Sequence, residues 1–60
     1  MKVISKVQLK DNSETWWHGA GFTTEKQDAK KMDSSTASAA FPRINQAYAD
    51  KSHLLLIKPA

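Results

Sequence analysis

The hydrophobic residues between positions 37 and 48 recur with the period of an α-helix. They are three or four residues apart, as one face of a helix requires, and they comprise Ala37, Ala40, Phe41, Ile44, Ala47 and Tyr48. At about 100° per residue they fall within a stripe roughly 120° wide. We therefore expect residues 37–48 to form a helix with one buried side, capped by Asp33 or Ser34.

Pro42 lies inside this predicted helix, on its polar side. A proline ring clashes with the carbonyl four residues earlier, here that of Ser38, and removes one N–H donor. Because water can satisfy this carbonyl on the polar side, the pattern favours a kink that is convex toward solvent. A break of the helix at Pro42 is the alternative.

Residues 2–10 alternate between hydrophobic and polar side chains. Val3, Val7 and Leu9 occupy odd positions, and polar residues occupy most even ones. This period of two predicts a strand with one buried face. Turn residues follow, and residues 15–22, with two tryptophans and a phenylalanine, predict a second strand.

A tight turn centred on positions 12 and 13 predicts how the two strands pair. It places Leu9 opposite Trp16, so that Trp16 enters the core with the odd-numbered residues of the first strand. Adjacent residues of a strand point to opposite faces, and Trp17 is therefore expected on the outer face. Gly19 and Gly21 weaken the second strand and are typical of a bulge.

Two more elements complete the predicted fold. Thr24-x-x-Gln27 fits a capping box and predicts a short helix that runs to Met32. Residues 53–58 predict a third strand, which Pro59 ends. The last strand is expected beside the first because the return across the helices is right-handed. We thus predict one α+β domain over residues 1–60, a three-stranded antiparallel sheet in the order 2-1-3 with one short and one longer, proline-kinked helix on one face.

Composition narrows the class of protein. The chain has 60 residues, a net charge of +3 and no cysteine. So small a core needs packing or a partner chain for stability, because neither disulfides nor thiolate zinc sites are available. The longest hydrophobic run is far too short to span a membrane, and the first residues lack the apolar core of a signal peptide. We expect a soluble, cytoplasmic protein.

The middle of the chain combines an aromatic residue and threonines at a strand end with a short helix and a serine-led amphipathic helix. The residues that carry this pattern are Phe22-Thr23-Thr24, Ala29-Lys30-Lys31-Met32, Ser34-Ser35, Ala37 and Ala40. The pattern resembles small, uncharacterised phage and prophage proteins of the lambda-like temperate type. This resemblance implies an α+β fold and an accessory protein in the host cytoplasm, and it implies no catalytic or binding residue.

Residues suited to catalysis are few. His18 and His53 are the only imidazoles, and neither has an acidic residue at a spacing that indicates a catalytic dyad. Two histidines are too few ligands for a zinc site, and the glycines at 19 and 21 lack the Lys-Ser/Thr of a phosphate loop. We therefore predict no enzyme activity, no metal and no cofactor.

Trp17, expected on the outer face near Lys6 and Lys10, leaves three interpretations open. It could anchor a protein interface, since tryptophan is enriched among interface hot spots. It could stack on a base while Lys6 and Lys10 contact phosphates, which would make the chain a weak single-stranded nucleic-acid binder. It could also lie across the aliphatic stems of the lysines with no partner.

The last predicted strand is apolar on both faces, through Leu54, Leu55, Leu56 and Ile57. The helices can cover only one face, and in the predicted order this strand is a sheet edge. Another protein or a second copy of the chain could cover the remaining apolar surface. The leading hypothesis is a non-catalytic protein-interaction module that acts through residues 54–57 and Trp17.

Overall fold

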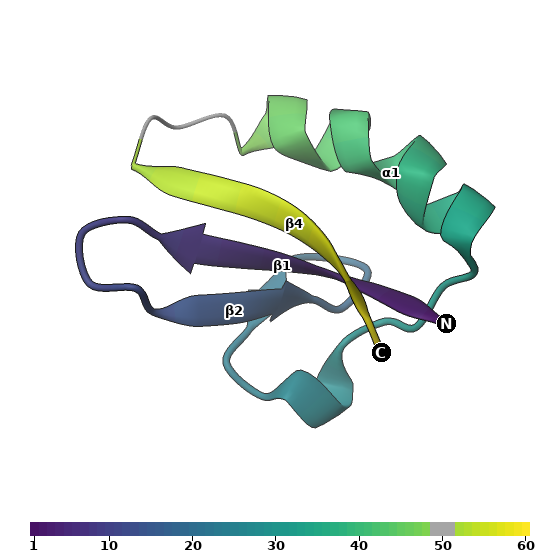
Figure 1. Ribbon diagram of the computed structural model, residues 1–60, viewed down its shortest axis with the longest axis horizontal. Helices are drawn as coiled ribbons and strands as arrows, with labels where there is room; N and C mark the ends of the chain where they lie inside the picture. Colours follow the sequence, from purple (N-terminus) through teal and green to yellow (C-terminus); the bar gives the residue numbers. More distant parts are fainter. Residues whose placement is uncertain (49–51) are drawn as a thin grey trace.

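The structure, a computed structural model, describes residues 1–48 and 52–60. Its elements in chain order are β1 (Lys2–Gln8), β2 (Glu14–Trp17), β3 (Phe22–Thr23), the 3-10 turn η1 (Lys26–Asp28), α1 (Ser34–Ala47) and β4 (His53–Pro59). Figure 1 shows one sheet with α1 along one side and η1 on the other. Of the predicted connection Asp50, Lys51 and Ser52, the first two residues lie outside the described residues.

The sheet has four strands in the order β3-β2-β1-β4, and every neighbouring pair is antiparallel. The prediction of three strands and two helices is therefore wrong. The expected second strand divides at a turn in which Gly19 has φ 112° and His18 N–H donates to the Gly21 carbonyl at 2.9 Å. Glycine permits this left-handed conformation, and the turn creates β3 as an additional strand.

The predicted short helix is also wrong, because only the single turn of η1 forms. The capping box is absent: Glu25 precedes η1 without a side-chain cap, and its N–H donates to Thr23 Oγ1 at 3.1 Å. The chain then becomes extended and pairs with the start of β1, where Met32 N–H donates to the Lys2 carbonyl at 2.8 Å. This segment prolongs the sheet instead of lying across it.

The register of β1 and β2 differs from the prediction. Trp16 lies opposite Ser5, not opposite Leu9, because β1 ends at Gln8 and the connection is wider than a two-residue turn. Within this loop Asn12 has φ 60°, and its N–H donates to the Gln8 carbonyl at 2.7 Å. Asparagine tolerates this left-handed conformation better than most residues do.

The face of the sheet that α1 covers is the opposite of the predicted one. Ile4, Trp17 and Leu55 belong to the hydrophobic core beneath the helix or pack against it, whereas Trp16 lies on the other face. The β2–β3 pairing explains this, because it places Trp17 opposite Phe22 and thus both large rings on one face. The expectation that Trp16 is the core tryptophan and Trp17 the outer one is wrong.

The hydrophobic core joins the sheet to α1. Its buried members are Ile4, Met32, Ala37, Ile44 and Leu55, and its partly buried neighbours are Trp17, Phe22, Ala40, Phe41 and Tyr48. Five of the six stripe residues predicted for the helix thus contact the core or form it, and Ala47 is exposed. The periodicity of the helix was the most reliable guide to the core.

Helix α1 begins and continues as its local sequence requires. Asp33 is the cap, and its Oδ1 accepts from Thr36 N–H at 2.7 Å and from the Ser35 hydroxyl at 3.1 Å. Hydrogen bonding from Thr36 lowers the pKa of the Asp33 carboxyl. The helix runs through Pro42 without a break, and Pro42 and Ser38 are both exposed, so water can reach the Ser38 carbonyl.

Candidate functional site

The face of the sheet away from α1 carries hydrophobic side chains from three strands. We call this the open face and define it by Val7 of β1, Trp16 of β2, and Leu54 and Leu56 of β4. Leu54 is 52% exposed and Leu56 is 37% exposed, whereas Val7 and Trp16 are half-buried. The pairing register aligns Val7 with Leu54 and places Trp16 and Leu56 on either side of Ser5, so these side chains are neighbours.

An ion pair crosses the open face. Lys58 Nζ lies 2.7 Å from Glu14 Oε2, and this pair links β4 to β2 across β1. Ser5, at the centre of β1, is fully buried. The hydrogen bond from Lys58 lowers the pKa of the Glu14 carboxyl. Glu14 therefore pairs with Lys58, the only lysine of β4.

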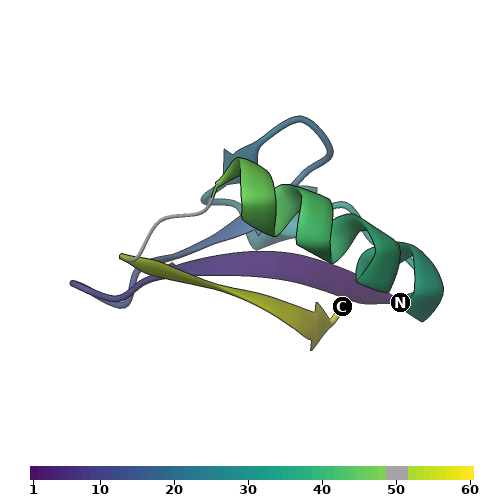
Figure 2. The same cartoon turned by 90° about the horizontal axis from the view of Figure 1, so that it is seen from above.

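Strand β4 is a free edge of the sheet. Leu9 N–H donates to the Ser52 carbonyl at 2.8 Å, and Ala60 N–H donates to the Met1 carbonyl at 2.9 Å. Because antiparallel hydrogen bonds alternate along a strand, the backbone groups of His53, Leu55 and Ile57 point away from β1. Figure 2 shows β4 beyond the edge of α1, so the helix does not cover this side.

The predicted residues 54–57 therefore divide between two environments. Leu55 is 8% exposed and belongs to the core, whereas Leu54 and Leu56 lie on the open face. Ile57 is 39% exposed and shares the helix-covered side with Leu55. Leu54 and Leu56 are available for contact, and the register places apolar side chains of residues 54–57 on both faces of the strand.

Trp17 and Lys6 lie together, but beneath α1 and not on the open face. Trp17, Phe22 and Tyr48 form a triangle of edge-to-face contacts, with centroid distances of 5.4, 6.1 and 5.0 Å. Lys6 Nζ lies 4.6 Å from the Phe22 centroid and 5.4 Å from that of Tyr48. Such cation–π contacts stabilise by about 0.5–2 kcal/mol, depending on burial.

Lys10 is not part of this cluster. It lies in the exposed loop after β1, two residues beyond the end of the strand. The structure thus brings Lys6 and Trp17 to the helix side and leaves Lys10 apart. The surface on which the nucleic-acid alternative depended, with Lys6, Lys10 and Trp17 side by side on an exposed face, does not form.

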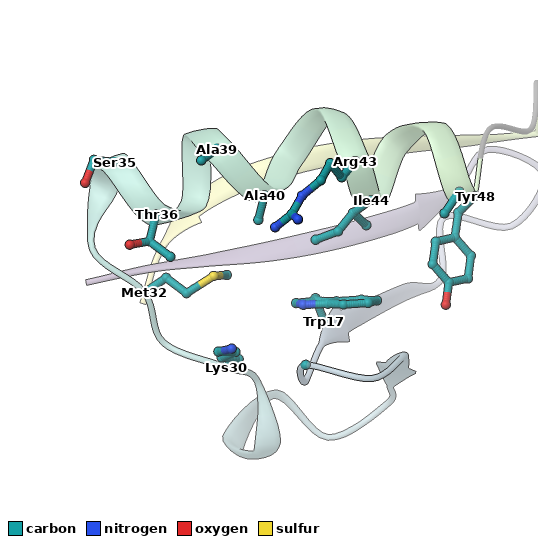
Figure 3. Close-up of a pocket in the computed structure, with 12 residues that line it drawn as sticks. Trp17, Lys30, Met32, Ser35, Thr36, Ala39, Ala40, Arg43, Ile44 and Tyr48 are labelled. Carbon is teal, nitrogen blue, oxygen red and sulfur yellow. The ribbon is translucent and has the colours of Figure 1, made fainter.

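A concave surface, separate from the open face, lies between α1 and the segment that leads from β2 to Met32. It is an open groove of about 660 Å³, and Trp17, Lys30, Met32, Ala40, Arg43 and Tyr48 are among the residues that line it. Figure 3 shows the Trp17 indole edge-on beneath α1, with the Arg43 side chain pointing from the helix into the space above it. Lys30 lies on the other side of the groove.

The sequence reading did not find this groove. Small residues on one flank of α1 were the available signal: Thr36, Ala39, Ala40 and Ala47 all line the groove and leave space that longer side chains would fill. Lys30 and Arg43 come from segments far apart in the chain, and only the position of α1 over Trp17 brings them to one site. Without the correct face for Trp17, this could not be anticipated.

The two histidines lie at opposite ends of the sheet. His18 is exposed in the turn after β2, whereas His53 is buried at the start of β4 opposite Gln8, at the other end of β1. Residues 1–48 and 52–60 contain no group of three or more histidine and acidic side chains that could hold a metal ion. In the same part of the chain, no helix combines the length and hydrophobicity that crossing a membrane requires.

Comparison of the chain with protein-family models, with curated proteins and with solved structures finds no match.

Proposed function

We propose that this chain is a non-catalytic protein-interaction module whose contact surface is β4 together with the open face. The observation that carries the proposal is the combination of an uncovered edge strand with exposed leucines on the side of the sheet that α1 leaves open. Edge strands usually carry a charge, a bulge or a proline that discourages pairing. Here Lys58 is bound to Glu14, and Pro59 comes only at the end of β4.

The backbone of β4 suits the addition of a strand. The N–H and C=O groups of His53, Leu55 and Ile57 point outward at alternate positions, as a fifth antiparallel strand would require. In β-strand addition, backbone hydrogen bonds supply affinity and alternate side chains supply specificity. The side chains of Leu54 and Leu56 then provide apolar contacts on the open face.

A second copy of the same chain satisfies this geometry. If a two-fold axis passes through Leu55, His53 of one copy pairs with Ile57 of the other, and Leu54 lies opposite Leu56. The four leucines of the open face then form one continuous patch. Pro59, which has no N–H, lies outside the paired residues. A strand from another protein, for example a host protein if the chain is phage-encoded, is the other partner of the same class.

Two substitutions of neighbouring leucines test the proposal. Leu56→Lys places a charge on the open face and should abolish association while leaving the fold intact, because this side chain is partly exposed. Leu55→Lys buries a charge in the core and should unfold the chain. Sedimentation equilibrium at several concentrations, with circular dichroism of each variant, measures both effects.

Thr24→Lys is the matched control, because Thr24 is exposed and lies outside the strands. It should change neither association nor fold. Capture of protein partners by the immobilised chain supplies the second readout for a heterologous partner. A wild-type chain that stays monomeric and captures the same proteins as Leu56→Lys would contradict the proposal.

A further inference from the structure

The groove beneath α1 combines an aromatic surface with two positive charges. Trp17 is half-buried in it, and Met32, Ala40 and Ile44 add apolar lining. Lys30 and Arg43 are both exposed and line the groove from its two sides. No acidic side chain is among its lining residues in the described part of the chain. The groove therefore suits a ligand with one flat apolar part and one negative group.

The position of the negative group is restricted by the start of α1. The Asp33 carboxylate occupies the N-terminal end of the helix, where it accepts from Thr36 N–H and the Ser35 hydroxyl. This charge repels an anion from that end of the groove, and the Thr36 N–H there is already bound. An anion is favoured between Lys30 and Arg43, where guanidinium and ammonium donors can both reach it.

The size of the groove agrees with a ligand of this kind. Its volume of about 660 Å³ lies within the range of about 300–1,000 Å³ that is typical of small-molecule sites. Tyr48 and Phe22 contact Trp17 in edge-to-face geometry, which holds the indole in a fixed orientation. Gly19, with φ 112°, also lines the groove, and a Cβ at this position would lie 3.6 Å from Lys30 Cδ, so the aliphatic part of Lys30 runs beside Gly19.

We infer that this groove binds a nucleotide, with the base against the Trp17 indole and the phosphate between Lys30 and Arg43. Bases stack on aromatic side chains with little dependence on sequence, and arginine pairs with phosphate through two parallel hydrogen bonds. The nucleotide can be free or part of a single strand. The inference is independent of the proposed β4 contact, because the groove lies on the helix-covered side of the sheet.

Titration of the isotope-labelled chain with adenosine monophosphate, followed by NMR, tests this site. The indole N–H signal of Trp17 is assigned with the variant Trp16→Phe, since the chain has two tryptophans. The nucleotide should shift the Trp17 signal and leave that of Trp16, on the open face, unchanged. Adenosine and inorganic phosphate should each bind at least about tenfold more weakly, because each lacks one of the two contacts.

The variants Arg43→Gln and Lys30→Gln should each weaken nucleotide binding about tenfold. Lys31→Gln is the matched control, because Lys31 is exposed and does not line the groove. An oligonucleotide that binds more tightly than the mononucleotide identifies a strand as the source, and equal affinity identifies the free nucleotide. An unchanged Trp17 signal with both ligands, or the same loss of affinity in Lys31→Gln, would overturn the inference.

Discussion

Replacing Ile4 by alanine should remove a large part of the stability of this chain. Ile4 is completely buried, at the centre of the sheet between β2 and β4, and it belongs to the cluster of five buried residues that the described part of the chain forms beneath α1. Truncation of a buried isoleucine to alanine costs about 2–5 kcal/mol. A folded chain of 60 residues has a total stability of about 3–9 kcal/mol. Ile4→Ala is therefore expected to be unfolded or close to it.

Leu9→Ala is the matched comparison, because it removes the same number of carbon atoms from a side chain that is 50% exposed. It should cost about 1 kcal/mol or less, since full burial of a leucine is worth about 1.5–3 kcal/mol. Urea unfolding followed by tryptophan fluorescence gives both values by linear extrapolation. If Ile4→Ala does not fold, Ile4→Val should still cost about 0.5–1.5 kcal/mol. A Leu9→Ala cost equal to that of Ile4→Ala would refute the difference in burial between these two side chains.

Three further changes have defined outcomes. Pro42→Ala should raise the free energy of unfolding by about 1–2 kcal/mol. Alanine restores a helix hydrogen bond, and this gain exceeds the loss that comes from a more flexible unfolded chain; a thermal melt measures the difference. Lys58→Met should lower stability at neutral pH by less than about 1 kcal/mol, since both partners of the ion pair are partly exposed. The paired Glu14 has a pKa below its ordinary 4.5, so this stabilisation is present above that value and is lost as the pH falls through the lower folded pKa. Lys6→Met keeps the aliphatic stem and should cost about 0.5–2 kcal/mol through the lost cation–π contacts, as chemical denaturation would show.

The elements of this fold with a clear period could be predicted from the sequence. The stripe of α1 identified Ala37 and Ile44 as core residues, and the last strand was expected at 53–58, where β4 forms. The cap at Asp33 could also be predicted, because its carboxylate serves the local N–H of Thr36. Such features depend on neighbours in the sequence.

The features that failed depend on loop geometry. Asn12, in the left-handed conformation, belongs to a first loop that is wider than the predicted two-residue turn. Trp16 therefore pairs with Ser5 and not with Leu9, as the sequence had predicted. The turn at Gly19 creates β3 and brings Phe22 beside Trp17, which decides the face that α1 covers. The predicted second strand, residues 15–22, has apolar residues at both odd and even positions. Its alternation was therefore too weak to decide beforehand which tryptophan faces α1.

For the candidate site, the contrast is similar. The apolar run at residues 54–57 could be recognised because it exceeds what one covered face can bury, and its role as a contact surface stays a prediction. The groove at Trp17 could not, since it depends on the face assignment. The resemblance to small phage-encoded proteins and the absence of catalysis stay predictions.

Amide hydrogen exchange along β4 tests the central claim most directly. The N–H groups of Leu54, Leu56 and Lys58 point toward β1 and should be protected from exchange at every concentration. Those of Leu55 and Ile57 point to the free edge. Dilute protein should exchange these two rapidly, and a high concentration of the chain, or a captured partner, should slow them to the rates of their neighbours. Exchange at Leu55 and Ile57 that remains fast in the associated state would contradict β4 as the contact surface.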